Sequence, residues 1–214
     1  MAWRKIMLSP LIKRRIFQVA KDLNKQVPNN YQQILGKIQE NCISEEKIIF
    51  SWLYGSGSMT LNANATIPHC VICTAGWAVR LVFYQDEKTF NAFRITLGHE
   101  LTHKEGDFFS FCYKRRDYKL MYQSREVHAD FGAAEKMTNC SRKKLLDSVR
   151  YKKALKETDK GDFFHPSWKR REYYVEHFNF DEELIRQIAI DVGCSNEKLI
   201  KRISEYYKKI ILRS

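Results

Sequence analysis

The sequence lacks both a long uninterrupted apolar run and a secretory signal. Its longest apolar stretch, residues 67–83, contains His69 and Arg80, so it is too short and too polar to cross a bilayer. The first 15 residues are basic and have none of the apolar core that a signal peptide needs. We therefore expect a soluble, cytoplasmic protein without a membrane-spanning segment.

Two other signatures are missing. The six cysteines are scattered without the spacing of a disulfide framework, which is typical of reduced thiols in the cytosol. Cys70 and Cys73 form a CxxC pair, but no second pair completes a zinc site, so we interpret them as ordinary core or surface thiols. The glycines at 55 and 57 indicate a turn and not a phosphate-binding loop.

Composition is that of a globular protein with a strong positive charge. Hydrophobic residues make up 44% of the 214 residues and charged residues 29%, which is enough for a sizeable core and argues against disorder. A net charge of +12 invites a nucleic-acid hypothesis. That charge is spread evenly, because residues 1–137 and residues 138–214 each carry an excess of six Lys and Arg over Asp and Glu. DNA binding is therefore the less favoured prediction.

The most informative motif is the pentad HELTH at residues 99–103. The preceding segment, residues 89–98, contains no proline and carries its apolar residues at helical spacing, so the pentad is predicted to lie on a helix. On a helix His99 and His103 share one face and can bind the same Zn²⁺, while Glu100 reaches a metal-bound water. This pattern is typical of enzymes that hydrolyse peptide bonds.

A catalytic zinc ion needs a third protein ligand. The metzincin pattern would place a histidine behind Gly106, but that position holds Phe109, which cannot bind zinc. A second candidate is Glu126, on a predicted helix that continues to about Met137. A third is His128 on the same helix, which points away from Glu126 and is interpreted as a surface histidine.

Four motifs together resemble a known family. HELTH followed by Glu-x-x-Ala-Asp at 126–130 is similar to the gluzincin metallopeptidases, in particular the CAAX-prenyl-protease and heat-shock-protease type and, more loosely, the ImmA/IrrE type. That group also carries an Asn-Ala pair upstream, found here at Asn62 and Ala63. Its late His-Pro…Arg motif resembles His165-Pro166 followed by Arg171.

The resemblance implies one zinc ion per chain, bound by His99, His103 and Glu126, with Glu100 as the general base. It implies that the Asp130 carboxylate orients a ligand histidine. These roles agree with the chemistry of zinc hydrolases, in which a carboxylate accepts the proton of a metal-activated water.

Four further residues have implied roles at the substrate. His165 would donate to the developing oxyanion, and Asn62 and Ala63 would lie on the strand that pairs with extended substrate. Arg171 is left between two interpretations, a supporting catalytic residue or a salt-bridging member of its own basic run at 169–171.

The resemblance implies a zincin-like α+β fold, mainly helical, with a small antiparallel or mixed sheet bordering the cleft. We expect an N-terminal helical cap over residues 1–43, a catalytic domain over 44–180 and a C-terminal helical extension over 181–214. In the cap, helices are predicted at 10–26 and 31–40.

Two further segments could contribute to recognition of a substrate or of DNA. Residues 107–122 are expected to form a loop beside the cleft. The basic run at 114–116 is interpreted first as a solvated face and, as the less favoured alternative, as a surface that prefers acidic substrates. Residues 184–203 resemble a helix-turn-helix that either binds DNA or supports the catalytic domain.

Two hypotheses of function follow. The first is a zinc-dependent metalloendopeptidase of gluzincin type that acts on a protein or peptide substrate. The alternative is a DNA-binding or interaction regulator on a zincin scaffold with little or no turnover. Glu100, the complete ligand set and His165 favour the enzyme.

Overall fold

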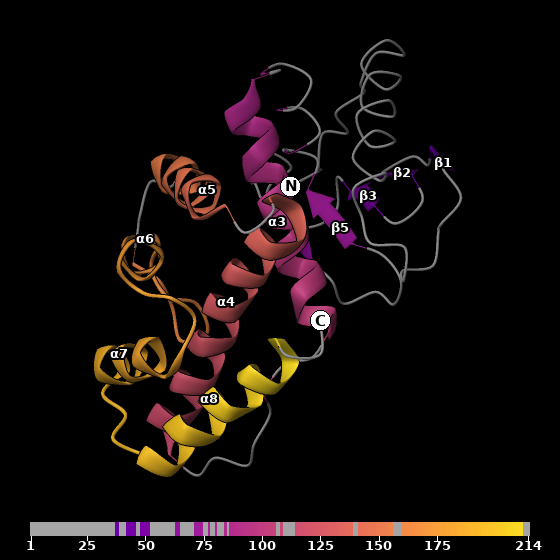
Figure 1. Cartoon of the computed structure of the whole chain (residues 1–214). Coiled ribbons are helices and arrows are strands. Elements are labelled where there is room, and N and C mark those ends of the chain that lie inside the picture. Colours follow the sequence, from indigo (N-terminus) through magenta and orange to yellow (C-terminus); the bar gives the residue numbers. More distant parts are fainter. Residues whose placement is uncertain are drawn as a thin grey trace, which may run out of the picture. The chain divides into compact units, whose positions relative to one another are not determined.

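The computed structural model falls into two compact units, residues 1–93 and 94–214, each described here by itself (Figure 1). Some residues inside helices and strands are described by their backbone alone. The described residues are 37–38, 42–45, 48–51, 63–64, 71–74, 77, 80, 84, 86–105, 108, 114–138, 141–155 and 160–211.

Helices dominate the described structure. Of the residues whose side chains are described, 78% are helical, and the described residues of the C-terminal unit form no sheet. The predicted α+β fold with a sheet is therefore wrong for this part of the chain. The physical reason is that each core cluster within residues 94–214 packs helix against helix, so no sheet is needed to cover an apolar face.

Short strand segments of two to four residues occur in the N-terminal unit, described mostly by their backbones. They pair in the order β1-β2-β3-β5-β4, parallel between β3 and β5 and antiparallel elsewhere. The predicted helix at 31–40 is contradicted at β1, whereas the helix predicted at 10–26 lies outside the described residues. The segments are β1 (Lys37–Ile38), β2 (Cys42–Glu45), β3 (Ile48–Ser51), β4 (Ala63–Asn64) and β5 (Val71–Thr74).

Helix α3 (Glu87–Glu105) carries the HELTH pentad without a break, as the sequence predicts. Asp86 caps its start, because the carboxylate accepts hydrogen bonds from the Thr89 backbone N–H at 2.8 Å and from the Thr89 hydroxyl at 3.0 Å. The boundary between the two units falls within this helix, after Phe93. The HELTH pentad thus belongs to the C-terminal unit.

Helix α4 (Arg115–Thr138) lies at the centre of the C-terminal unit (Figure 1). The loop predicted at 107–122 is wrong from Arg115 onward, because helical hydrogen bonding already starts at Lys114 and buried Leu120 and Met121 continue the apolar stripe of the helix. The basic run 114–116 therefore forms the start of a helix, and Tyr122 lies on the same helix as Glu126.

One side of α4 packs against α5 (Arg142–Ala154) and α6 (Trp168–His177). Ser141 and Ser167 cap these two helices through their hydroxyls, and Arg142 ties them together by donating to the Val175 carbonyl at 2.5 Å. The shared core consists of Ile95, Ala133, Ala134, Leu145, Val149 and Val175.

The other side of α4 packs against α7 (Glu182–Val192) and α8 (Glu197–Ile211). Gly193 ends α7 in the left-handed region with φ of 70°, a conformation that favours glycine. Asp117 of α4 holds the turn between the helices by accepting hydrogen bonds from the Cys194 thiol at 3.2 Å and the Asn196 amide at 3.0 Å. This helix pair is thus anchored to α4. Whether 181–214 and 1–43 are separate domains stays a prediction.

Among the described residues, no helix combines the length and the apolar character needed to cross a membrane.

Candidate metal centre

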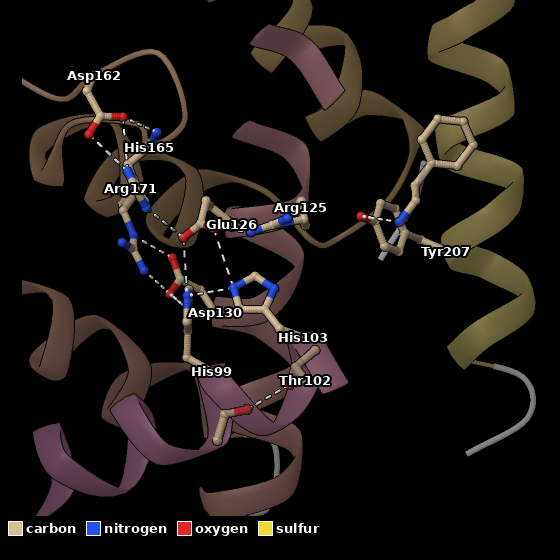
Figure 2. Close-up of polar contacts among 12 residues, drawn as sticks. His99, Thr102, His103, Arg125, Glu126, Asp130, Asp162, His165, Arg171 and Tyr207 are labelled. Carbon is tan, nitrogen blue, oxygen red and sulfur yellow. Dashed lines mark hydrogen bonds and ion pairs between the residues drawn. The ribbon is translucent and has the colours of Figure 1, made fainter. Parts of the chain in front are cut away.

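The pentad places two imidazoles side by side on α3 (Figure 2). The Nε2 atoms of His99 and His103 are 3.1 Å apart, and the rings meet edge to face. Thr102 lies between them in sequence but turns its hydroxyl back onto the helix, where it donates to the Gly98 carbonyl at 2.8 Å. Helical spacing therefore gives two converging nitrogen ligands from one element.

Glu126 on α4 completes a cluster of three ligands. Its Oε2 lies 3.2 Å from His99 Nε2, and its Oε1 lies 3.4 Å from His103 Nε2. One donor atom from each residue can be chosen so that all lie within 4.8 Å of one another. The structure thus brings together the three residues that the sequence predicts as metal ligands.

The spacing and chemistry of this cluster fit a small divalent cation. A tetrahedral zinc ion with bonds of about 2.0–2.1 Å holds its ligand atoms about 3.3–3.4 Å apart. The separation of 3.1 Å between the two Nε2 atoms is close to that value, and each imidazole has a different Glu126 oxygen beside it, at 3.2 Å from His99 and 3.4 Å from His103. Two imidazole nitrogens and one carboxylate oxygen are also a ligand set that catalytic zinc sites use, and they leave a fourth position for water or substrate.

Glu126 is ionised despite being buried. Burial by itself raises the pKa of this carboxyl, but hydrogen bonds and the charges of His103 and His99 outweigh it and hold the pKa well below its usual range. Arg125 adds a guanidinium whose Nη2 lies 3.6 Å from Glu126 Oε1. A permanently charged carboxylate at this place favours a cation between α3 and α4.

Asp130 holds His99 from behind. Its Oδ1 lies 3.0 Å from His99 Nδ1, and Arg171 donates to both carboxylate oxygens, with 2.7 Å between Nε and Oδ2. Burial raises the pKa of Asp130, but the Arg171 charge and the His99 hydrogen bond lower it overall to about 2. An ionised Asp130 can accept the proton of Nδ1, and in that tautomer the lone pair of His99 is on Nε2 and faces the cluster.

Arg171 is a buried partner of Asp130 and not a member of a surface charge run. Burial alone lowers the pKa of its guanidinium, yet the carboxylates of Asp130, Glu126 and Glu100 outweigh this effect and raise it. The Trp168 ring covers the guanidinium at 4.2 Å. The contact with Asp130 shows which neighbour Arg171 has, while a catalytic role stays a prediction.

His165 reaches the cluster from the loop before α6. Its Nε2 lies 3.8 Å from Glu126 Oε2, and its Nδ1 lies 3.0 Å from both carboxylate oxygens of Asp162 (Figure 2). Asp162 Oδ1 also accepts the backbone N–H groups of Phe164 and His165 at 2.7 Å. The Asp162 carboxylate thus directs Nε2 of His165 toward the metal ligands.

The loop that carries His165 is held by two further residues. Gln123 of α4 donates from its side-chain amide to the Asp162 carbonyl at 3.1 Å. Gly161 has φ of 63°, and a Cβ added to it would lie 2.6 Å from the Ser167 backbone nitrogen. A side chain at this position would displace the turn, because it would clash with backbone atoms and not with a flexible side chain.

Sequence reasoning missed Asp162, Gln123 and Gly132. The signal for Asp162 is its position three residues before His165, the spacing of a side chain that caps a turn. At Gly132 a Cβ would lie 2.7 Å from the Thr102 side chain, so this glycine allows the close approach of α4 to α3.

His128 is not a surface histidine, and that interpretation is wrong. The side chain is buried, stacks on Tyr207 with ring centroids 4.1 Å apart and lies near Phe180. Helix α8 covers the side of α4 that carries His128. A side chain that points away from Glu126 is therefore still buried. His128 is not part of the three-residue cluster that can hold a metal.

Two of the predicted substrate residues lie in the N-terminal unit. Asn62 is outside the described residues, and Ala63 is buried in β4. Their role at a substrate cleft stays a prediction, as does the role of Glu100 as a base.

Comparison with known proteins adds no further information: no family, no curated protein and no solved structure matches this chain. A cluster of two histidines and a glutamate is a candidate metal site and does not by itself define a gluzincin.

Proposed function

We propose that the protein is a zinc-dependent metalloendopeptidase that hydrolyses peptide bonds. The observation that supports this proposal is the convergence of His99, His103 and Glu126, which can each offer one ligand atom within 4.8 Å of the others and are residue types that catalytic zinc sites use. When bound there, zinc would lower the pKa of a water molecule toward about 7 and polarise a peptide carbonyl. Among the described residues, no second cluster of this kind occurs.

The ligands are presented in the required protonation states by their neighbours. Asp130 keeps the proton of His99 on Nδ1, and Arg171 keeps Asp130 ionised. The contacts of Glu126 with His99 and His103 outweigh burial and hold the pKa of this carboxyl well below its usual range. A preorganised ligand set of this kind binds a cation without first losing protons from its carboxylates.

Glu100 is the proposed general base. It directly follows His99 on α3 and is partly buried, and its charge acts on the nearby Arg171 guanidinium. A carboxylate there accepts the proton of the attacking water and passes it to the leaving amine.

His165 is the proposed donor to the tetrahedral oxygen. Because Nδ1 donates to Asp162, Nε2 can donate only when the ring is protonated, and the Asp162 carboxylate stabilises that imidazolium. A donor aimed at developing negative charge contributes on the order of 10²-fold in rate.

The test of this proposal is Glu100→Gln. If Glu100 is a base and not a ligand, zinc-loaded Glu100→Gln keeps about one zinc per chain while cleavage falls by several orders of magnitude. Cleavage is measured as fragments released from a broad peptide library and analysed by mass spectrometry. Glu135→Gln, at an exposed position on α4, is the matched control and should cleave as the parent does. Equal cleavage by Glu100→Gln and the parent would exclude the mechanism.

A further inference from the structure

Three aromatic side chains gather directly beside the candidate metal centre. Tyr122 of α4 meets Phe164 edge to face with ring centroids 4.9 Å apart. Phe163 lies 5.2 Å from Phe164 and 6.2 Å from Tyr122. We call this group of three rings the aromatic ledge.

The ledge adjoins the ligands through two elements. Tyr122 stands four residues before Glu126 on α4, so the two side chains share a face with about 5–6 Å between their Cβ atoms. Phe164 directly precedes His165, and their ring centroids are 6.4 Å apart. A peptide whose scissile bond lies at the metal ligands would therefore place a neighbouring side chain within reach of these rings.

Phe164 is held in place although its ring is open to solvent. The side chain is 49% exposed, whereas its backbone N–H donates to Asp162 at 2.7 Å in the turn that also positions His165. An exposed large aromatic ring on a fixed turn is a surface prepared for apolar contact. Tyr173 on the nearby α6 is also exposed, but it packs on His177 and Phe178 and is not part of the ledge.

Cationic groups border the ledge on the α4 side. The Arg115 guanidinium lies over the Phe163 ring at 5.5 Å, and the Arg125 guanidinium lies over the Tyr122 ring at 5.7 Å. The Arg125 guanidinium already lies 3.6 Å from the Glu126 carboxylate. Arg115 is exposed and lies at the Phe163 end of the ledge, away from the metal ligands. A carboxylate on the substrate is thus favoured near Arg115.

We propose that the aromatic ledge is the subsite that selects the substrate: it receives a large apolar or aromatic side chain next to the scissile bond, with an acidic residue of the same peptide at Arg115. This inference deepens the proposed peptidase function and rests on it. The substrate class is a polypeptide segment in which an aromatic residue lies near Asp or Glu. The basic run that begins α4 is then part of substrate recognition through Arg115.

The first test measures binding without turnover. Zinc-loaded Glu100→Gln is titrated with three fluorescein-labelled peptides of one length, carrying Phe with Asp, Phe with Asn, or Ala with Asp, and anisotropy gives Kd. The Phe-with-Asp peptide should bind most tightly. Adding Phe164→Ala should weaken both Phe peptides about tenfold and leave the Ala peptide unchanged. Tyr173→Ala, the matched exposed aromatic, should change none of them.

The charge component is tested in the same assay. Adding Arg115→Gln should raise Kd several-fold for the Phe-with-Asp peptide and leave the Phe-with-Asn peptide unchanged, because only one of them carries a carboxylate. Circular dichroism of each variant at the assay temperature checks that it is folded. Equal Kd values for all three peptides, or no effect of Phe164→Ala, would overturn the inference.

Cleavage separates this inference from the proposed function. In a peptide-library digest by the parent, cleaved bonds should be enriched in aromatic residues on one side, and Phe164→Ala should lose the enrichment while still cleaving. Cleavage without enrichment overturns the ledge and keeps the peptidase. Failure of the parent to cleave, with binding that still depends on Phe164, overturns the peptidase and keeps the ledge as a peptide-binding surface.

Discussion

A series of side chains holds His99 in the candidate metal cluster. Asp130 holds His99, Arg171 holds Asp130, and Trp168 covers Arg171. Such a series of contacts fixes the direction of the ligand nitrogen's lone pair more narrowly than a rotamer preference can. Substitution of a residue that supports a ligand therefore alters metal affinity.

Glu126 is the ligand whose removal is most informative. Glu126→Ala should lose most of the bound zinc, because two histidines alone leave the cation with only two protein ligands. Zinc per chain is measured by elemental analysis after dialysis. His128→Ala is the control on the same helix and should retain zinc, although loss of its stacking on Tyr207 will lower stability. The reverse pattern would transfer the ligand role to His128.

Asp162 should act on catalysis through His165. Asp162→Asn removes the carboxylate that stabilises the imidazolium, so kcat should fall by about tenfold or more with little change in KM. His165→Phe should lower kcat further, and the double variant should be no worse than His165→Phe alone, because both changes remove one interaction. Effects that multiply in the double variant, or a loss confined to KM, would show that Asp162 does not work through His165.

At the scale of elements, α4 organises the C-terminal unit. It supplies Glu126, Asp130 and Tyr122 and packs against two separate helical cores. Its close approach to α3 depends on Gly132, next to Thr102. The ligands on α3 and α4 are therefore placed by helix packing and not by loops, which gives a metal site a rigid frame.

The pair α7 and α8 tests the alternative function. Lys198, Lys201 and Arg202 are exposed on α8, where a DNA-reading helix would present them. We expect no duplex to be bound in a sequence-specific way. The apolar faces of both helices are buried in the core with α4, and the charge of the chain is evenly spread. Footprinting at physiological salt tests for a specific site, and a salt titration measures how the affinity for each duplex depends on salt.

Replacing these three residues by alanine provides the decisive comparison. Residual affinity of the parent should fall steeply with salt for every duplex alike, and the triple variant should weaken all of them together while cleaving peptides normally. A footprint on one sequence that disappears in the triple variant would establish the DNA-binding alternative.

For the whole molecule, metal binding should be linked to stability. A cation bound by His99, His103 and Glu126 joins α3 to α4, so removing it should lower the Tm of the parent. A ligand present at 100 times its Kd stabilises the folded state by about 2.7 kcal/mol. The measurement is thermal unfolding with EDTA and with preformed zinc–EDTA as its control. Glu126→Ala should show the same Tm in EDTA and in zinc–EDTA. If the parent also has the same Tm in both solutions, the metal does not contribute to the stability of the fold.

The sequence by itself determined the centre of the site. HExxH spacing on a proline-free helix puts His99 and His103 on one face by helical geometry alone, and an acidic residue on a second helix supplies the third donor. The helical character of α3, of the second half of α4 and of the α7–α8 pair likewise follows from local apolar periodicity. Cytoplasmic location, zinc identity and peptidase activity stay predictions.

Tertiary structure decided the rest. Whether α4 began at Arg115, which neighbour Arg171 paired with, and whether His128 was buried all depended on residues far away in the chain. Asp162 and Gly132 acquired their roles only when His165 was brought to Glu126 and α4 to Thr102. Helical periodicity is a local property that a sequence displays directly, whereas burial and pairing arise from contacts between segments 30 or more residues apart, such as Asp130 with His99 and with Arg171.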